Sequence, residues 1–254
     1  MELPTKKREA KAVNPNTLLI YAPPKVGKTT IAAQLENSLI LELERNGADF
    51  VSGCILDIEK PSEFEKALEE IEKAGKPYDY LIIDTLTKLD EWSEIMGTYN
   101  YMNKSQGKKF NRDEKGQVIY HTDSRFESVH ELGNGAGYQH SRNQMMEWYD
   151  KIVPLAKHVI FIAHIKDKFV ESKTGDTVEA SEINLTGKVK SIITSRVDAV
   201  GYLRRKGKQA FLSFDNEYKT ISGGRCKHLQ GEILISEKLE DGTIKTYWEN
   251  IYIK

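Results

Sequence analysis

One segment decides how this chain begins to fold: Thr17-Leu-Leu-Ile-Tyr-Ala-Pro-Pro-Lys-Val-Gly-Lys-Thr-Thr30. Residues 17–21 form a short apolar run, which is typical of a buried strand in a parallel sheet. The proline pair and Gly27 then predict a turn, and a helix is expected from about residue 28 to residue 35. The segment therefore predicts a strand, a tight turn and a helix in direct succession.

The next 130 or so residues repeat this alternation of strands and helices. Apolar runs predict further strands, at residues 38–43, 54–58, 80–84 and 158–163, of which 54–58 is either an edge strand or a loop. Apolar side chains at helical spacing predict helices at residues 61–74 and 138–156. Strands that alternate with helices imply an α/β fold with a mostly parallel sheet flanked by helices, whose ligands bind at the carboxyl ends of the strands.

The chain is expected to divide into an arm, a core and a tail. Residues 1–15 are polar and predict a flexible N-terminal arm, and residues 16–230 are expected to form the core. Residues 97–137 are a long polar insertion, and such a connection is usually functional or disordered. A short helix and β-rich segments are predicted late in the core, at residues 188–194, 197–203 and 209–214. Residues 231–254 predict a C-terminal β-hairpin that turns at Asp241-Gly242.

The charge of the chain is polarised along its length. The 254 residues carry a net charge of -1, which excludes only a uniformly basic, histone-like binder. Residues 36–94 hold sixteen acidic and six basic side chains, whereas residues 188–227 hold ten basic and three acidic ones. A local basic stripe matters more for nucleic-acid binding than the net charge does, although a solvated surface of mixed charge would give the same counts.

Composition also predicts where the protein works. The longest apolar runs fall short of the 18 residues that a membrane span needs, so no membrane partner is expected. The charged N-terminus does not resemble a secretory signal. Two cysteines cannot build a disulfide framework, and Cys/His clusters with zinc spacing are missing from the sequence. These features predict a cytoplasmic protein.

The turn after the first strand matches a phosphate-binding loop. The pattern is Gly, four residues and Gly-Lys-Ser/Thr, and here Ala22 replaces the first glycine. Lys28 is expected to pair with the β- and γ-phosphates of ATP and the Thr29 hydroxyl to ligate Mg²⁺. The helix that follows adds its positive N-terminal end. The expected nucleotide-binding residues are those of this loop and the first turn of the helix: Ala22, Pro23, Pro24, Lys25, Val26, Gly27, Lys28, Thr29 and Thr30.

Carboxylates follow two of the predicted strands. Asp84 ends the apolar run 80–84, and we expect it to hold Mg²⁺ through a water molecule as the second carboxylate of the site. An Asp at this place could instead cap the N-terminus of the next helix, and both roles could hold together. Glu42 and Glu44 end the strand that starts at residue 38, and their spacing places them on one face. Either glutamate could orient or activate the attacking water, and solvated carboxylates at a strand end are the plainer alternative.

His164 directly follows the apolar strand 158–163. A polar side chain at this strand end is expected to face the same crevice as Asp84. There it could sense the γ-phosphate and move the polar loop 166–184 that follows it. A structural histidine is the alternative.

Taken in order, these residues resemble the RecA-like ATPase core, over about residues 16–230. The resemblance is closest to phage RecA-superfamily proteins with an AAA-type nucleotide-binding domain, which act in single-strand annealing and recombination. The motifs that carry it are the run from Tyr21 to Thr30, Phe-Ile-Ala-His164 and the segment from Val197 to Leu203. The resemblance implies that Glu44 activates the water, that His164 takes the place of a glutamine in bacterial RecA, and that the phage host's cytoplasm is the compartment.

The resemblance also implies partners. Loops 97–137 and 166–184 fall where RecA-like proteins have DNA-binding loops, which implies single-stranded DNA as a ligand. In the first loop, four cations could meet phosphates and three aromatic rings could stack on bases: Lys104, Lys108, Lys109, Arg112, Tyr99, Tyr101 and Phe110. An insertion with ordinary surface lysines is the alternative.

A late basic pair, Arg225 and Lys227, resembles the pair that reaches the nucleotide of a neighbouring subunit and stabilises transition-state charge. This implies a homo-oligomer, either a ring or a filament. A DNA-backbone contact or simple solvation would give the same sequence. A single-strand-binding protein is a further partner that the resemblance raises.

Four functions follow from these patterns. The first is an ATP-hydrolysing protein of DNA recombination or annealing. The sequence does not show the long N-terminal and C-terminal domains of bacterial RecA, and this favours annealing over extensive strand exchange. The second is a ring-forming, helicase-like motor or loader, and the third is a nucleotide-switched binding module with little turnover. A small-molecule kinase would need an arginine-rich lid, and the stretch 97–137 contains two arginines.

Overall fold

The strands of the protein form one large sheet. The computed structural model describes all residues except 1–2, 4, 6, 120–126, 172–176 and 216–220, and it describes only the backbone of residues 167–171 and 177–181. The strands are β1 (Thr17–Ala22), β2 (Ser38–Glu42), β3 (Ile55–Asp57), β4 (Tyr80–Asp84), β5 (His158–Glu171), β6 (Thr177–Ile183), β7 (Ala199–Lys206), β8 (Gln209–Ser213), β9 (Gly223–Gly224), β10 (Glu232–Lys238) and β11 (Ile244–Thr246).

The sheet has a parallel part and an antiparallel extension. Its order is β3-β2-β4-β5-β1-β7-β8-β10-β11, with β6 paired to β5 and β9 to β7. Every pair from β3 to β7 in this order is parallel, and every pair from β7 to β11 is antiparallel. The predicted fold class is therefore confirmed: an α/β fold with a mostly parallel core and a β-rich C-terminal tail.

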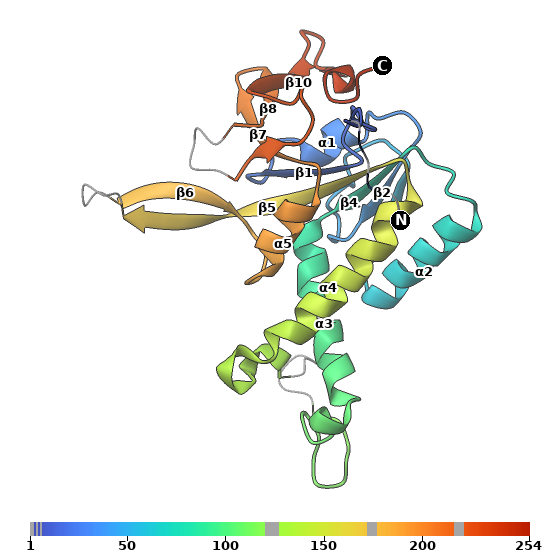
Figure 1. Cartoon of the computed structure of the whole chain (residues 1–254), viewed down its shortest axis with the longest axis vertical. Coiled ribbons are helices and arrows are strands. Elements are labelled where there is room, and N and C mark those ends of the chain that lie inside the picture. Colours follow the sequence, from blue (N-terminus) through green and yellow to red (C-terminus); the bar gives the residue numbers. More distant parts are fainter. Residues whose placement is uncertain (1–2, 4, 6, 120–126, 172–176, 216–220) are drawn as a thin grey trace.

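The helices cover the two faces of this sheet unequally (Figure 1). They are α1 (Lys28–Ala32), α2 (Pro61–Lys73), α3 (Leu86–Met102), α4 (Tyr138–Ile152) and α5 (Val189–Arg196). The apolar side chains of α2 to α5 pack with one set of alternating strand residues, including Leu19 and Phe161. The other set, including Ile20 and Ile160, packs with α1 and with the C-terminal residues around Trp248. Because neighbouring strand residues point to opposite faces, both faces of the apolar strands are buried.

Three predicted elements differ from those in the structure. The first helix ends at Ala32 rather than residue 35, because the N–H groups of Gln34 and Leu35 bond three residues back and tighten the last turn. The predicted loop 166–184 is largely a hairpin, in which β5 continues to Glu171 and pairs antiparallel with β6. Its polar sequence lacks the apolar run that marks a buried strand. In the C-terminal hairpin, the second strand is only three residues long and a 3-10 turn, Trp248–Asn250, follows it.

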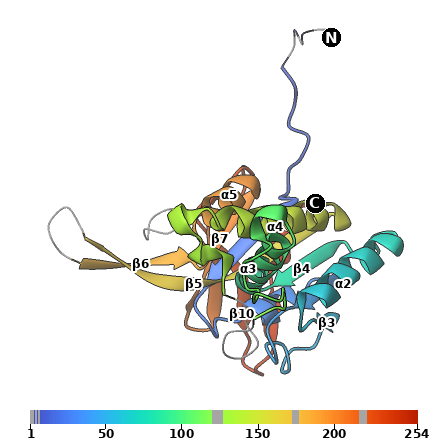
Figure 2. The same ribbon diagram turned by 90° about the horizontal axis from the view of Figure 1, so that it is seen from below.

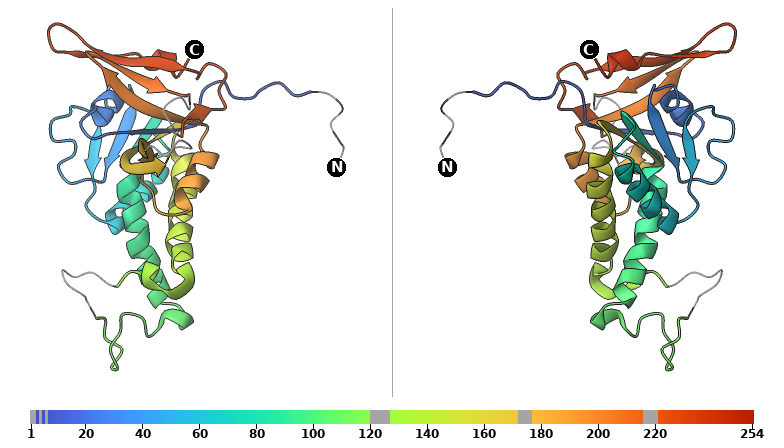
Figure 3. Two further views of the ribbon diagram at one scale, coloured as in Figure 1. Left: turned by 90° about the vertical axis from the view of Figure 1, so that its left-hand side faces the viewer. Right: turned by 90° about the vertical axis from the view of Figure 1, so that its right-hand side faces the viewer.

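Helices α3 and α4 lie side by side and extend beyond the sheet as an arm (Figure 3). The predicted insertion 97–137 begins inside α3, which continues to Met102, and 3-10 turns occupy Ser105–Gly107, Val129–Glu131 and Gly133–Gly135. Gly97 lets the two helices approach, since a Cβ there would lie 2.7 Å from the backbone nitrogen of Ser141. The two helices thus carry the insertion away from the carboxyl edge of the sheet.

The N-terminal segment leaves the body of the molecule (Figure 2), and residues 7–13 are exposed. In the part of the chain that the structure describes, every helix is too short or too polar to cross a membrane.

Candidate active site

The P-loop joins the carboxyl end of β1 to the start of α1. Gly27 has a φ of 99° and a ψ of 29°, a left-handed conformation in which a side chain is strained. A Cβ at this position would also lie 3.2 Å from Nη2 of Arg205. Both the conformation and the space at this position therefore favour glycine.

Lys28 is the first residue of α1, and its side chain is held inside the loop. Its Nζ donates to the carbonyl oxygens of Pro23 at 3.1 Å and Ala22 at 3.4 Å. Burial lowers the pKa of Lys28, while the nearby carboxylates of Asp84 and Glu44 act in the opposite direction. The ammonium group thus lies between the loop and two carboxylates, where a P-loop lysine would meet the β- and γ-phosphates.

Thr29 and Asp84 bring two oxygen donors together beside Lys28. Thr29 Oγ1 donates to Asp84 Oδ2 at 2.5 Å, although the two residues come from α1 and from the end of β4. Asp84 is buried, with 3% of its surface exposed, and this burial raises its pKa. Hydroxyl and carboxylate oxygens are ligands that Mg²⁺ accepts, together with water and phosphate. These two residues therefore fit the expected ion.

Glu42 and Glu44 occupy different environments. Glu42 ends β2 with 3% of its surface exposed, and its Oε1 accepts the backbone N–H of Glu44 at 3.0 Å. Burial raises the pKa of Glu42 to about 8, and neighbouring Asp84 adds to the shift. Glu44 is half-buried, and hydrogen bonding by His164 lowers its pKa. At neutral pH Glu42 is therefore protonated and Glu44 is ionised.

The Glu44 carboxylate is fixed by two donors. Its Oε1 accepts the Thr85 hydroxyl at 2.8 Å and lies 2.8 Å from Nε2 of His164. Thr85 is also the N-cap of α3, because its Oγ1 accepts the backbone N–H of Lys88 at 3.1 Å. His164 is the β5 residue in register with Ala22 of β1, so it lies directly beside the P-loop. The ends of β2 and β4 and the middle of β5 thus converge on one carboxylate.

The protonated state of Glu42 predicts an unusual pH dependence of stability. Its pKa is about 8 in the folded protein and 4.5 ordinarily, so between these values the folded state binds the extra proton and stability falls as pH rises. Each pKa unit corresponds to about 1.4 kcal/mol, and we expect a loss of about 2–4 kcal/mol from pH 5 to 8. Glu42→Gln should remove this part of the loss. Urea unfolding at four pH values measures it, and parallel curves for the two proteins would contradict the assignment.

The late basic pair lies elsewhere in the chain. The Arg225 guanidinium donates to the Ser195 carbonyl at 2.5 Å and to Asp198 Oδ1 at 3.3 Å. The other carboxylate oxygen of Asp198 accepts the backbone N–H of Thr17, the first residue of β1. Arg225 therefore lies at the amino end of β1, roughly 17 Å of strand from the P-loop. Exposed Lys227 lies two residues later, and neither residue meets the loop of its own chain.

Two residues that sequence reasoning missed contact the P-loop and α1. Arg205, near the end of β7, donates from Nη2 to the Val26 carbonyl at 3.1 Å. Trp248, from the 3-10 turn near the C-terminus, donates from its indole nitrogen to the Ile31 carbonyl at 2.9 Å. Arg205 belongs to the basic segment 188–227, but spacing alone does not single it out. Trp248 lies more than 200 residues from α1, so its contact depends on the tertiary fold.

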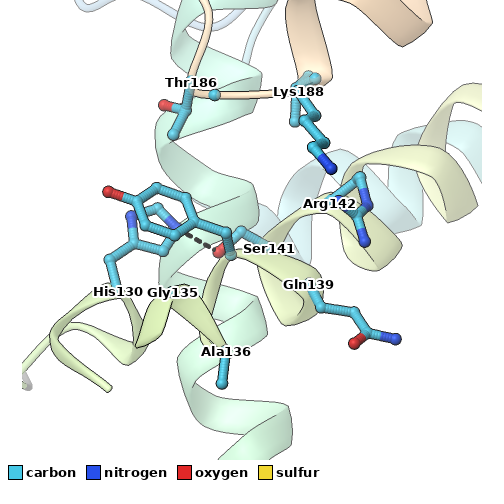
Figure 4. Close-up of a pocket in the computed structure, with 11 residues that line it drawn as sticks. His130, Gly135, Ala136, Gln139, Ser141, Arg142, Thr186 and Lys188 are labelled. Carbon is cyan, nitrogen blue, oxygen red and sulfur yellow. Dashed lines mark hydrogen bonds between the residues drawn. The ribbon is translucent and has the colours of Figure 1, made fainter. Parts of the chain in front are cut away.

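Away from the P-loop, a cationic cavity of about 380 Å³ lies at the base of the arm. It is lined by residues of α4, the turns before it and the loop before α5, among them His130, Tyr138, Ser141, Arg142, Thr186 and Lys188. Figure 4 shows Arg142 and Lys188 on the same side of this cavity, with the Lys188 amine directed toward Arg142. Neither cation forms an ion pair with a carboxylate of the described residues. The cavity therefore suits an anion.

Backbone and side-chain contacts connect this cavity to Glu44. The backbone N–H of His164 donates to Thr87 Oγ1 at 3.0 Å, and its carbonyl accepts the Asn184 N–H at 2.9 Å. Two residues later, the Thr186 N–H donates to Asp90 Oδ2 at 2.6 Å. The loop that carries Lys188 is therefore tied to His164 and to α3.

The predicted DNA-contacting residues of the insertion lie at the far end of the arm. The Tyr101 ring packs edge-on against Phe110, with centroids 5.6 Å apart, and against His140 at 4.8 Å. Arg112 donates to the Gly116 carbonyl at 3.0 Å. Tyr99 and the lysines at 104, 108 and 109 are exposed. Tyr101 and Phe110 thus pack against each other, while Tyr99 is open to solvent. Part of the same loop, 120–126, lies outside the described residues.

Comparison with known proteins places the chain in a family. A family model described as an AAA domain matches residues 14–226, and no curated protein matches. Among solved structures, the RadB recombinase and a KaiC-like protein from the archaeon Pyrococcus horikoshii are similar at 12% identity each, with a TM-score of 0.45. The RadB match covers 92% of each chain, and the KaiC-like match covers 91% of this chain and 89% of the other. Because the AAA domain match spans most of the chain and includes the whole P-loop, the protein belongs to the AAA domain family of P-loop NTPases.

Proposed function

We propose that the protein binds ATP with Mg²⁺ and hydrolyses it, and that single-stranded DNA controls this turnover. One observation carries the hydrolytic part of the proposal. The ionised Glu44 is held by Thr85 and His164, each at 2.8 Å, beside Lys28 and the Thr29–Asp84 pair. These are the groups that phosphate binding, metal binding and water activation require.

In the proposed reaction each residue has a separate task. The backbone of the P-loop and Lys28 hold the phosphates, and Thr29 and Asp84 would hold Mg²⁺, which neutralises phosphate charge when bound. Glu44 orients the attacking water and accepts its proton as the bond from that water to the γ-phosphorus forms and the bond to ADP breaks. Thr85 and His164 keep the Glu44 carboxylate in position, and His164 reports the state of the γ-phosphate to the β5–β6 hairpin.

The cationic cavity supports single-stranded DNA as the controlling ligand. Arg142 and Lys188 offer two positive groups to a phosphodiester backbone, and the first turns of α4 and α5 lie beside them. The contacts from His164 through Asn184 to Thr186 supply a physical route from that cavity to Glu44. We infer a role in recombination or annealing. We place the nucleotide of a neighbouring subunit against Arg225 and Lys227, because within one subunit this pair lies far from the P-loop.

The test is ATP turnover with and without single-stranded DNA at several salt concentrations. We expect DNA to stimulate turnover, and the stimulation to fall steeply with salt. Intact ATP affinity without turnover would replace the proposal with a nucleotide-switched binding module. Directional unwinding of a duplex would identify a motor, whereas annealing of complementary strands without unwinding supports the proposal.

The double variant Arg142→Ala/Lys188→Ala tests the cavity directly. Removal of two phosphate contacts should reduce the slope of log affinity against log salt by about 1.4 for a single strand. Fluorescence anisotropy with a labelled oligonucleotide, repeated at salt concentrations from about 50 to 200 mM, gives this slope. The matched control is Lys73→Ala/Lys151→Ala, which removes the same charge from lysines paired with glutamates on α2 and α4. Equal slopes for the two double variants would exclude the cavity as the DNA site.

A further inference from the structure

The outer half of β7, residues 203–206, pairs with β8 and not with β1. We call the chain from there to the turn Trp248–Asn250 the C-terminal extension, and it touches the nucleotide-binding segment at two points. Arg205 of β7 donates to the Val26 carbonyl at 3.1 Å, just before Gly27 and Lys28. Trp248 donates to the Ile31 carbonyl at 2.9 Å, at the other end of α1. The two contacts therefore bracket the loop and the short helix that present Lys28 and Thr29.

Arg205 differs from its neighbours on the same strand. Arg204 and Lys206 are both paired with Glu232 of β10, whereas Arg205 forms no ion pair with a carboxylate of the described residues. Arg205 is exposed, yet its guanidinium hydrogen-bonds the backbone of the loop at Val26. Among the described residues, Lys28 of the adjoining helix also bonds this backbone, at Pro23, so Arg205 is the contact that reaches the loop from a distant part of the chain. The remaining N–H groups of its planar fork are free to hold the loop or a phosphate beside it.

Trp248 is fixed from the opposite side. Its ring is buried, with 6% exposed, and packs in the cluster that contains Ile31, Ala32 and Leu35. α1 is only five residues long, so it supplies little of its own helical stability. The position of Lys28 and Thr29 then depends on what packs around α1. The AAA domain match ends at residue 226, so Trp248 lies outside the region that the family model covers.

We propose that Arg205 and Trp248 are positioning residues that clamp the P-loop and α1 in their phosphate-binding geometry, so that the C-terminal extension sets nucleotide affinity. The proposal rests on the nucleotide binding proposed above. By thermodynamic reciprocity, nucleotide binding must then stabilise the extension. The clamp acts on the ground-state position of the loop, so its loss should raise KM and the ATP dissociation constant far more than it lowers kcat.

Three variants test the clamp. Arg205→Ala should weaken binding of a fluorescent ATP analogue by about 10- to 100-fold, the usual effect of losing a charged hydrogen bond. Trp248→Phe keeps the aromatic ring in the core and loses only the donor, and a decrease of about 2- to 10-fold is expected. Arg205→Lys retains a charged donor and should restore part of the affinity. Lys206→Ala is the matched control, because it removes the same charge from the next position of β7, away from the loop, and should bind like wild type.

A second readout separates positioning from general stability. Hydrogen exchange of residues 232–252 in the wild-type protein should slow when ATP is added, and this protection should be lost in Arg205→Ala and Trp248→Phe. Wild-type affinity in both variants would overturn the clamp while leaving the proposed function intact. Affinity losses equal to that of Lys206→Ala would also overturn it. A wild-type protein that fails to bind the analogue would instead refute the proposed function itself.

Discussion

Lys28→Ala is expected to abolish measurable ATP turnover and to weaken ATP binding by about 100-fold or more. Lys28 Nζ is held by the Pro23 and Ala22 carbonyls between the loop and two carboxylates, so a phosphate beside it would receive a charge-assisted hydrogen bond in a partly buried site. Such bonds contribute about 1.5–3 kcal/mol each, and a P-loop lysine contacts two phosphate groups. Isothermal titration with ATP and a phosphate-release assay measure the two effects.

The control for this variant is Lys25→Ala. Lys25 belongs to the same loop and carries the same charge, but its side chain is exposed. Its backbone has a positive φ of 64°, and alanine has to adopt the same angle as lysine, so the substitution mainly removes the charge. We expect its removal to change ATP affinity by no more than about threefold, since an exposed charge interacts weakly through water. Unchanged turnover in Lys28→Ala would refute the P-loop assignment. Equal losses of ATP affinity in the two variants would show that Lys28 acts only through a general effect of positive charge.

The parallel core could be predicted because its signals are local. Strands β1, β2, β4 and the first half of β5 are apolar runs that are buried on both faces, and Asp84 and His164 fall at or just after the ends of two such runs. The β5–β6 hairpin could not be predicted, because residues 166–184 are polar and provide no apolar run to mark them as strands. The pairing of β10 with β8 likewise could not be predicted. The turn at Asp241-Gly242 specifies only that β10 pairs with β11, and it does not specify which other strand lies beside β10.

The candidate site was predictable where one element defines a residue's place. Lys28, Thr29 and Asp84 follow from the strand–loop–helix pattern and from a strand end, and the structure brings them together with Glu44 and His164. Arg205 and Trp248 were missed because they reach α1 from late strands and turns, across more than 170 positions of sequence. The different protonation states of Glu42 and Glu44 could not be predicted from the sequence either. Strand alternation places both side chains on one face, and they differ only in how deeply the fold buries them.

Glu44→Gln is the second large effect that we expect, and it separates chemistry from binding. The glutamine Oε1 can still accept the Thr85 hydroxyl and the His164 N–H, each 2.8 Å away in the wild type, so the site should keep its shape. What is lost is the ionised oxygen that takes the proton of the attacking water. General bases contribute about 10²- to 10⁴-fold; we therefore expect kcat to fall by that factor while the ATP dissociation constant changes by less than about threefold.

Glu42→Gln provides the matched comparison, because it makes the same chemical change two residues earlier. At pH 7 Glu42 is already protonated, its pKa being about 8, so replacing it with a neutral isostere should leave kcat nearly unchanged. Single-turnover hydrolysis by the two variants at pH 7 decides between the glutamates. If Glu42→Gln loses turnover and Glu44→Gln keeps it, the roles are reversed and the buried carboxyl must ionise when ATP binds. If both keep it, the water is activated by neither glutamate, and the bond between Glu44 and His164 serves only to hold β5 against the segment that follows β2.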